Sequence, residues 1–475
     1  MKSTAHKFTA QATVALKDIQ LQQALAKARG GFVDRRRAAV SALPEFDALR
    51  DAASALREHT LDHLDYYLER FEQRLTAKGG KLHWARTAQD ACRVVVDLCR
   101  NAKARHIAKG KSMVAEEIGL NEALQQAGFE VTETDLGEYI IQLAHEPPSH
   151  IIAPAVHKTR DQIADLFHAH HARYSLTQRD VEVPALVNEA RTVLRRRFLE
   201  ADAGITGANF LVAETGSCVV VTNEGNGDLS ATLPRVHIVI AGVDKLVPTL
   251  DDSAVLLRLL ARSATGQEMT AYTTFFTGPR RPEDLDGPEE FHVVLVDNGR
   301  SEMLGGEFRA MLLCIRCGAC LNHCPVYNAV GGHAYGWVYP GPMGAVLTPL
   351  LLGLPHAVDL PNASTLCGRC EEVCPVRIPL PQLLRGLRER AHRAGLSSRR
   401  AALGLKLWAF LAKRPLLYRG VMRLAARWLH TLGRRAGRFK RLPLAGGWTA
   451  ARDFPTPQGE TFQALWKKHR RGKQQ

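Results

Sequence analysis

The pattern of apolar and polar positions divides this chain into stretches with different periods. In the first 80 residues, five apolar side chains recur at spacings of three and four with charged residues between them: Leu61, Leu64, Leu68, Phe71 and Leu75. Residues at these spacings share one face of a helix, so the stripe predicts an amphipathic helix. Gly79 and Gly80 end it. We therefore expect an N-terminal helical segment over residues 1–80.

Between residues 81 and 300, short apolar runs alternate with helical ones. The expected strands include Gly128–Thr132, Phe210–Ala213, Ser217–Thr222, His237–Ala241, Ala271–Phe276 and Phe291–Val296. The expected helices include Ala88–Asn101, Met113–Gln126, Ala185–Ala201 and Ala254–Ser263. This alternation favours a layered α/β domain with a substantially parallel sheet.

The pattern changes again after residue 296. The polar run Asp297–Arg300 breaks the last strand, and a short helix is expected to lead to residue 314. Residues 301–384 form the next expected module, and its middle, residues 331–361, is rich in Gly and Pro. Such a composition is typical of loops, so we expect no regular element there.

The C-terminal region, residues 385–475, has a cationic amphipathic pattern. Leu417, Val421, Leu424 and Trp428 lie on one helical face, and Arg419, Arg423 and Arg427 lie opposite. The region holds 23 Lys and Arg against three acidic residues, hence +20, whereas the other 384 residues hold 40 against 45, hence −5. A basic helix of this kind suits an anionic membrane face or an acidic partner. A packed helical cap with a solvated rim is the alternative, and nucleic-acid binding is not indicated because no recognised module accompanies the charge.

Length and hydropathy limit the remaining possibilities. A chain of 475 residues suggests about three domains. Residues Met1–Ile19 contain no continuous apolar core of a signal peptide. The longest apolar run, Ala345–Val358, is interrupted by Pro349 and Pro355 and is shorter than the roughly 20 residues that span a bilayer. We expect a cytoplasmic protein, with peripheral contact at the inner face of the membrane through the basic region as an open alternative.

Seven of the ten cysteines form two runs with the spacing of iron–sulfur ligands. The first run is Cys314, Cys317, Cys320 and Cys324, followed by Pro325. The second is Cys367, Cys370 and Cys374, followed by Pro375, with Ser364 in the slot of its first cysteine. In the bacterial two-cluster pattern, the last cysteine of each run ligates the other cluster. The prediction is a [4Fe–4S] cluster on Cys314, Cys317, Cys320 and Cys374, and a second cluster on Cys324, Cys367 and Cys370.

Zinc and disulfides are the rival interpretations of these cysteines. A zinc ribbon pairs two separated knuckles and has no use for four closely spaced cysteines with a trailing proline. Disulfides need an oxidising compartment, for which the chain has no signal. The other three cysteines, Cys92, Cys99 and Cys218, lie in apolar stretches and are expected to be buried, inert thiols.

The second cluster has one corner without a thiolate, so it can be a labile [4Fe–4S] or a [3Fe–4S] centre. Ser364 can supply an alkoxide as the fourth ligand. One hypothesis is that substrate oxygens bind this iron as a Lewis acid. The hypothesis we favour is that oxygen ligation only tunes the reduction potential, because no base is evident beside that position.

Candidate acid–base residues are few. Glu214 and Glu224 lie in turn sequences, Glu214–Gly216 and Asn223–Gly227, whose backbone amides can cradle a carboxylate or phosphate; plain strand-end turns are the alternative. His145 is a candidate proton acceptor for oxidation of a 2-hydroxy acid. Three other histidines lie near Pro-rich turns: His150, His157 and His237. Each is either a proton acceptor of the same kind or a structural hydrogen-bond donor.

Several longer motifs carry a resemblance. They are residues 142–150 (QLAHEPPSH) with 151–154 (IIAP), 207–210 (GANF), 213–216 (AETG), 221–227 (VTNEGNG), 233–237 (LPRVH) and 374–380 (CPVRIPL). With the cysteine runs, they resemble the lactate-utilisation iron–sulfur protein family, LutB-like, also called LldF or YkgF. The resemblance implies an LUD domain, similar in fold to sugar-phosphate isomerases and CoA-transferases, joined to an α-helical ferredoxin-type module. It also implies work beside companion LutA-like and LutC-like proteins that together oxidise L-lactate to pyruvate.

The leading hypothesis is thus an iron–sulfur electron-transfer subunit of an L-lactate-oxidising oxidoreductase complex. No G-x-G-x-x-G loop follows a strand, so NAD dependence is not indicated. Whether the chain is itself an enzyme stays open. The alternatives are a non-redox lyase or isomerase that uses the open cluster corner as a Lewis acid, and an iron–sulfur sensor that docks through its basic region.

Overall fold

Two compact units make up the chain, residues 1–391 and 392–475. The computed structural model describes residues 3–396, 398–443, 445–449 and 452–472. The expected boundaries at residues 80, 300 and 384 remain predictions, and helix α18 (Leu380–Arg393) runs through the last of them.

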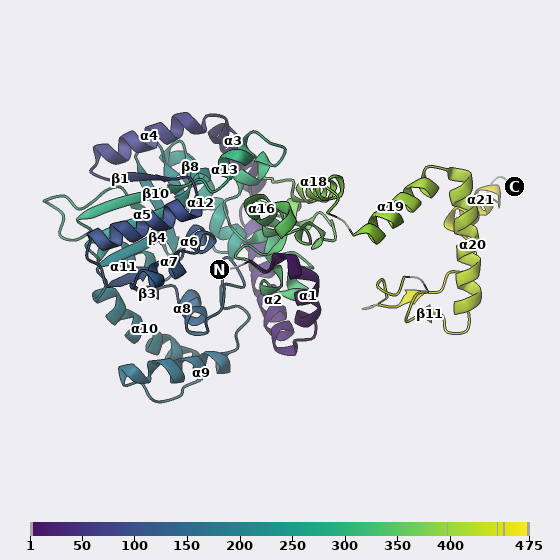
Figure 1. The fold of residues 1–475 in the computed structure, drawn as a ribbon, viewed down its shortest axis with the longest axis horizontal. Helices are drawn as coiled ribbons and strands as arrows, with labels where there is room; N and C mark the ends of the chain where they lie inside the picture. Colours follow the sequence, from purple (N-terminus) through teal and green to yellow (C-terminus); the bar gives the residue numbers. More distant parts are fainter. Residues whose placement is uncertain (1–2, 397, 444, 450–451, 473–475) are drawn as a thin grey trace. The chain divides into compact units, whose positions relative to one another are not determined.

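A six-stranded sheet with all neighbours parallel lies at the centre of the first unit (Figure 1). In spatial order its strands are β1 (Lys81–Ala85), β10 (Glu290–Val296), β7 (Val236–Gly242), β4 (Ala203–Gly207), β2 (His106–Lys109) and β3 (Glu130–Glu133). From β2 the chain passes to β3 on one side and from β3 to β4 on the other, so the direction of winding reverses between β2 and β4. The predicted α/β class with a substantially parallel sheet is confirmed.

The two faces of this sheet bury different layers, because alternate residues of a strand point to opposite faces. Ile238 and Ile240 of β7 pack with α5 (Ala88–Asn101), α6 (Met113–Ile118) and α7 (Leu120–Gln126). Val239 and Ala241 face α4 (Leu64–Ala77) and a second, four-stranded sheet. That sheet has the order β8 (Leu246–Val247), β5 (Phe210–Val212), β6 (Ser217–Thr222) and β9 (Tyr272–Phe276).

Further helices complete the first unit. They are α1 (Phe8–Ala15), α2 (Ile19–Ser41), α3 (Phe46–Asp62), α8 (Leu136–Leu143), α9 (Arg160–His171), α10 (Val183–Leu199), α11 (Asn226–Thr232), α12 (Leu250–Ala264), α13 (Arg300–Leu304), α14 (Ala319–Asn322), α15 (Tyr327–Val330), α16 (Gly341–Leu352) and α17 (Arg369–Glu372). Short 3₁₀ turns lie at η1 (Ala5–Lys7), η2 (Ala172–Tyr174), η3 (Val243–Lys245), η4 (Arg309–Leu313), η5 (His333–Tyr335), η6 (Leu354–His356) and η7 (Leu360–Asn362). Thr87, Thr159 and Thr249 begin α5, α9 and α12 with capping boxes, which satisfy otherwise free backbone amides.

Two expectations about helices need correction. The apolar stripe of residues 61–75 spans two helices, α3 and α4, because the backbone leaves the helical region at His63 (φ −123°, ψ 35°). Residues 341–352 form the buried helix α16, where we expected only loop. This helix has no polar face, so no amphipathic period marks it, and its first proline, Pro342, is compatible with a helix start.

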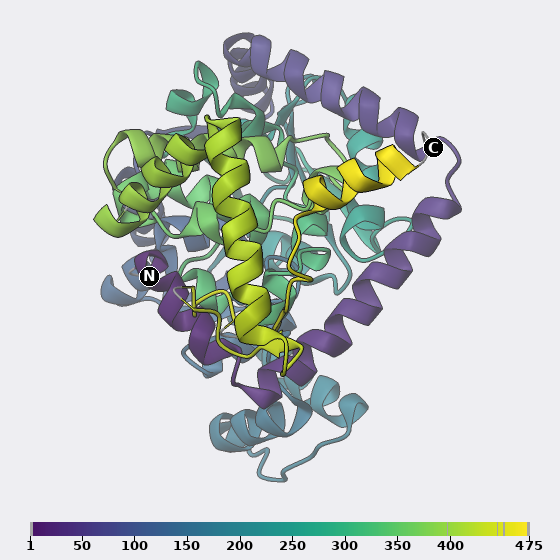
Figure 2. The same cartoon turned by 90° about the vertical axis from the view of Figure 1, so that its right-hand side faces the viewer.

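The second unit consists mainly of α19 (Arg399–Ala412), α20 (Pro415–Gly433) and α21 (Phe462–Gly472). A short antiparallel pair, β11 (Arg438–Phe439) and β12 (Phe454–Pro455), lies between α20 and α21 in the chain. Figure 2 turns this unit toward the viewer. The predicted amphipathic helix corresponds to α20. No helix of the described residues combines the length and the apolar character needed to cross a bilayer.

Candidate iron–sulfur centre and adjoining cavity

The seven cysteines of the two runs lie in two neighbouring groups within the first unit. Four of them line one cavity of about 370 Å³ with otherwise mostly apolar walls, here called the cysteine cavity: Cys314, Cys317, Cys320 and Cys374. The other three are Cys324, Cys367 and Cys370, and the thiols of Cys367 and Cys370 both lie near enough to Cys324 to interact electrostatically with it. Cys320 in turn interacts with Cys370, so the two groups are adjacent. These are the two sets that the spacing predicts.

Both runs use the same backbone turn. Arg316 and Leu366 each adopt a left-handed conformation, with φ of 59° and 54°. The amide of Arg316 donates to Sγ of Cys314 at 3.4 Å, and the amide of Leu366 donates to Oγ of Ser364 at 3.1 Å. Ser364 therefore occupies in the second run the place that Cys314 occupies in the first.

The two groups differ in exposure. In the first group, Cys317 and Cys374 are buried, and Cys314 and Cys320 are half-buried. In the second, Cys367 is exposed, as is the neighbouring Leu366. No cysteine of the first group is exposed, whereas the second group reaches the surface at Cys367.

The arrangement fits a polynuclear cluster better than a single metal ion. Tetrahedral zinc with Zn–S bonds of 2.3 Å needs sulfurs about 3.8 Å apart. Among the described residues, the one group of three or more metal-type ligand atoms within 4.8 Å of one another is Glu146, His157 and His333, so no three cysteine sulfurs are that close. Burial also raises the pKa of Cys317 to about 12, so a bound cation is needed to hold its thiolate.

Backbone amides supply the hydrogen bonds that such sulfurs require. The amide of Tyr327 donates to Sγ of Cys324 at 3.5 Å, and the amide of Ile378 donates to Sγ of Cys374 at 3.4 Å. Hydrogen bonds to ligand sulfurs stabilise the negative charge of a cluster and set its potential. The residues present therefore fit iron–sulfur clusters.

Three buried arginines from the N-terminal helices hold the cysteine segments in place. Arg36 of α2 donates to the carbonyl of Val373 at 3.1 Å. Arg50 of α3 donates to the carbonyl of Cys374 at 2.9 and 3.0 Å. Arg57, 1% exposed, donates to four carbonyls: Leu246 at 2.7 Å, Leu312 at 2.8 Å, Leu313 at 3.4 Å and Asp244. The N-terminal helices thus form part of the cysteine module, which sequence analysis did not anticipate.

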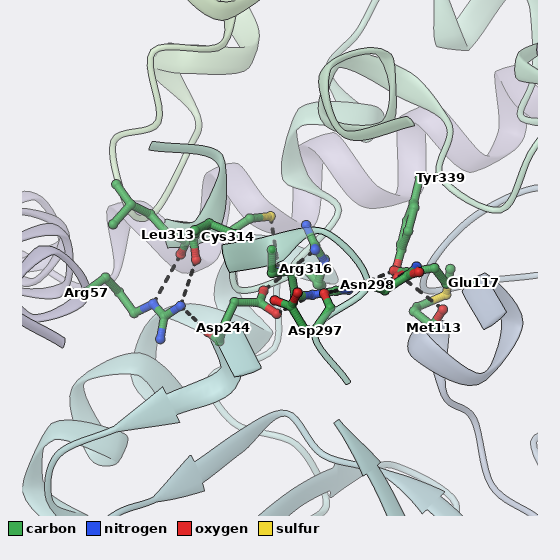
Figure 3. Close-up of polar contacts among 12 residues, drawn as sticks. Arg57, Met113, Glu117, Asp244, Asp297, Asn298, Leu313, Cys314, Arg316 and Tyr339 are labelled. Carbon is green, nitrogen blue, oxygen red and sulfur yellow. Dashed lines mark hydrogen bonds and ion pairs between the residues drawn. The ribbon is translucent and has the colours of Figure 1, made fainter. Parts of the chain in front are cut away.

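A buried charge network lies next to Cys314 (Figure 3). Arg300, 2% exposed, donates to both carboxylate oxygens of Glu117 at 2.8 Å and to Asp244 at 2.8 Å. The hydroxyl of Tyr339 donates to Glu117 at 2.7 Å. Burial alone would raise the pKa of Glu117, but the Arg300 guanidinium outweighs it and lowers that pKa. The network joins α6, η3 and α13.

A second, larger cavity opens at the carboxyl ends of the parallel strands. It measures about 1420 Å³ including its open mouth and is here called the switch-point cavity. Its walls include Gly110 after β2, Gly207 at the end of β4 and Ile240 of β7. A Cβ on Gly207 would lie 3.0 Å from Oγ of Ser112, so glycine lets the loops after β2 and β4 approach each other. Ile151 and Arg316 line this cavity and also the cysteine cavity.

The predicted acid–base residues fall in different places. Glu224 lines the switch-point cavity and accepts a hydrogen bond from the amide of Leu136 at 3.3 Å. Glu214 lies outside its lining and accepts from the amide of Leu250, at the start of α12. His145 is exposed and lies outside the lining as well. The structure therefore brings one of these three residues, Glu224, to the cavity.

The other candidate histidines are held in hydrogen bonds. Nε2 of His150 is 2.9 Å from Oδ1 of Asn322, and its Nδ1 accepts from two backbone amides; burial lowers its pKa to about 4. His157 is bonded to Ser149 and Glu146. His237 is bonded to Thr206. The contacts of His150 and His157 indicate a structural role for the 142–154 motif, because its loop packs against the cysteine module.

The four basic residues of the switch-point cavity were missed by sequence analysis, whereas one of its two acidic residues, Glu224, was expected and the other, Asp135, was not. The basic residues are Lys111, Lys245, Arg300 and Arg316. One signal was available for Lys245: the pair Asp244–Lys245 follows the apolar strand β7 at the carboxyl edge of the sheet. The remaining cysteines lie outside both groups; Cys99 and Cys218 are buried as expected, and Cys92 is half-buried.

Comparison with known proteins gives matches along the whole chain. The LUD domain model matches residues 68–296, the 4Fe-4S dicluster domain model residues 310–378, and the model for the C-terminal part of lactate utilisation protein B residues 385–471. Lactate utilization protein B of Lysinibacillus sphaericus is 44% identical over 99% of this chain and 98% of its own. The protein of that name from Bacillus licheniformis is 44% identical over 100% and 99%.

An uncharacterized electron transport protein, YkgF, of Escherichia coli is 43% identical over 99% of this chain and 98% of its own. A solved DUF162 family protein from Deinococcus radiodurans aligns with 49% of this chain and 98% of its own, with 14% identity and a TM-score of 0.28. The predicted iron–sulfur cofactors are confirmed by the dicluster match.

Proposed function

Because this chain belongs to the lactate utilisation protein B family, we propose that it is the iron–sulfur electron-transfer subunit of a multi-protein system that oxidises L-lactate to pyruvate. One observation carries the proposal: the seven cysteines form two adjacent groups, one without an exposed cysteine beside the switch-point cavity and one that reaches the surface at Cys367. This arrangement suits a relay from an interior site to an external partner.

In this proposal the two groups have distinct ligand roles. The first cluster is held by Cys314, Cys317, Cys320 and Cys374, and the second by Cys324, Cys367 and Cys370, with Ser364 as the candidate fourth ligand. Oxidation of L-lactate to pyruvate releases two electrons and two protons, and each bound cluster accepts and passes on one electron at a time. The exposed side of the second group, at Cys367, is where electrons leave for a companion lactate-utilisation protein.

The test is anaerobic electron paramagnetic resonance on the purified protein. We expect L-lactate to reduce the clusters only when the companion proteins are present, and D-lactate to be much less effective. Clusters that stay oxidised in the complete mixture would contradict the proposal. A change in the second cluster's signal on adding substrate, without net reduction, would instead favour the Lewis-acid alternative, because Ser364 takes the ligand position of a cysteine in the second run.

The second unit has a separate proposed role, attachment to an anionic membrane surface. In α20 the apolar side chains Leu424 and Trp428 are 68% and 50% exposed, and the three arginines of its other face are exposed too. A helix with this division lies in the headgroup region of anionic lipid.

Replacing Arg419, Arg423 and Arg427 together with Glu should weaken binding of the full protein to vesicles of anionic lipid at least a hundredfold. Each basic residue near such a surface contributes about 1 kcal/mol. Cosedimentation measures the effect. The matched control replaces Arg37, Arg93 and Arg281 of the first unit, whose side chains are 72%, 70% and 73% exposed. Equal loss in both triple variants, or none in the first, would count against this role.

A further inference from the structure

Two cations at the switch-point cavity have unused hydrogen-bonding capacity. Lys245 lines the cavity and is 7% exposed. Among the described residues, its ammonium group donates no hydrogen bond and has no carboxylate oxygen within 4.0 Å, although the Asp244 carboxylate is near enough to interact with it electrostatically. Most of this side chain is buried, so its ammonium has little hydration beyond what the cavity provides, and a partly dehydrated charge favours a bound partner. A ligand that supplies acceptor oxygens would satisfy it.

Arg316 is the second cation. Its Nη2 lies 3.7 Å from Oδ2 of Asp244, and its guanidinium lies 5.2 Å from the ring centre of Tyr339. Its Nη1 is buried without a hydrogen-bond partner, as is Oδ2 of Asp244. Arg300, in contrast, is fully engaged by Glu117 and Asp244. Lys111 donates to the carbonyl of Ile152 at 3.0 Å. Among the described residues that line the cavity, Lys245 and Arg316 are therefore the cations whose side chains donate no hydrogen bond to the protein and can bind an anion.

The position of these cations in the fold agrees with a binding site. The cavity lies at the carboxyl ends of β2 and β4, where the winding of the parallel sheet reverses. Open α/β sheets bind ligands in the crevice at this reversal point. The same walls carry Ile151, Ile152 and Leu260, which can face an apolar group of a ligand.

From these observations we propose that the switch-point cavity binds the carboxylate of a small organic acid, with Lys245 and Arg316 as its charged partners. Binding of a carboxylate rests on the two cations. The narrower ligand class, a 2-hydroxy or 2-oxo acid such as lactate or pyruvate, rests on the proposed function. Arg316 follows Cys314 by two residues and lines both cavities, so the bound acid lies beside the first cysteine group. Its negative charge should then alter the resonance signal of that cluster and leave the other unchanged.

The experiment is anaerobic calorimetry of the intact, cluster-loaded protein with L-lactate and pyruvate, without companions. We expect saturable binding that is at least tenfold weaker in Lys245→Met and largely retained in Lys245→Arg. Lys27→Met, a change on an exposed surface of α2, is the matched control and should bind as the unaltered protein does. Iron content and thermal unfolding establish that each variant is folded.

Absence of carboxylate binding at millimolar concentration, or equal binding by Lys245→Met, would overturn the inference. Inorganic phosphate that displaces pyruvate at equal concentration would overturn the carboxylate assignment. The outcome is independent of the electron-transfer test: acid that binds to a protein whose clusters lactate never reduces would remove the proposed function and leave the site. If lactate reduces the clusters of a chain that binds no acid, the proposed function stands and the carboxylate site is disproved.

Discussion

Replacing Cys324 with alanine is expected to abolish one iron–sulfur cluster and to leave the other largely intact. Cys324 lies next to Cys367 and Cys370 and does not line the cysteine cavity, whose four thiols form a complete ligand set. With Cys324 gone, the second cluster would keep only two thiolates. Iron and sulfide per chain should fall by about half, and one set of resonance signals should disappear while the other persists.

The control for this variant is Cys92→Ala. Cys92 is half-buried, belongs to neither group and donates only to the carbonyl of Ile118 at 3.4 Å. Its replacement should leave the iron content and both sets of signals unchanged. Undiminished iron in Cys324→Ala would exclude Cys324 as a ligand. Loss of every signal in a folded protein would show that the two groups do not hold clusters independently.

Replacing Arg300 with methionine should lower the free energy of unfolding by about 3 to 5 kcal/mol. Arg300 is 2% exposed and is the principal partner of two buried carboxylates, Glu117 and Asp244. Removing one partner of a buried ion pair leaves an uncompensated charge, which costs far more than the pair itself contributes. The network also touches Tyr339 and Arg316, so the loss should reach the cysteine module.

Chemical denaturation under anaerobic conditions measures this effect on the cluster-loaded protein. Arg281→Met is the control, because Arg281 is 73% exposed and pairs only with surface carboxylates, so its loss should cost less than about 1 kcal/mol. The double change Arg300→Met with Glu117→Gln should recover part of the stability, since it removes one of the stranded charges. An Arg300→Met protein as stable as the control variant would disprove the structural importance of the network.

The parts of the fold that sequence could predict are those with a clear period and strong apolar character. Helix α5 has the predicted bounds, Ala88–Asn101, and β6, β7 and β10 were expected within a residue at each end. Strands β2 and β4 were missed although both lie inside the large sheet. Each is short, and β2 ends in Lys109, a fully buried cation that pairs with Glu116 and Glu133. A buried charge of this kind interrupts the apolar pattern by which a strand is predicted, and its carboxylate partners are evident only in the folded structure.

The same contrast holds for the site. The cysteine groups could be expected because ligand spacing is a local property of the sequence, as is the place of Ser364 in the second run. The sequence could not show that Lys245 and Arg316 line one cavity. Lys245 belongs to η3 and Arg316 to the first cysteine run, and the two come together only where these segments pack against each other. The burial of Arg50 and Arg57 could not be predicted either. An arginine in an amphipathic helix ordinarily points to solvent, and the carbonyls that these two bind lie far along the chain.

Two inorganic clusters held by cysteines between residues 314 and 374 are the central feature of this protein. The most direct measurement is quantitative analysis of iron, inorganic sulfide and zinc in protein isolated without exposure to air. It should yield iron and sulfide in nearly equal amounts, about seven to eight of each per chain, and a brown protein with negligible zinc. A colourless protein that contains stoichiometric zinc and no sulfide would contradict it.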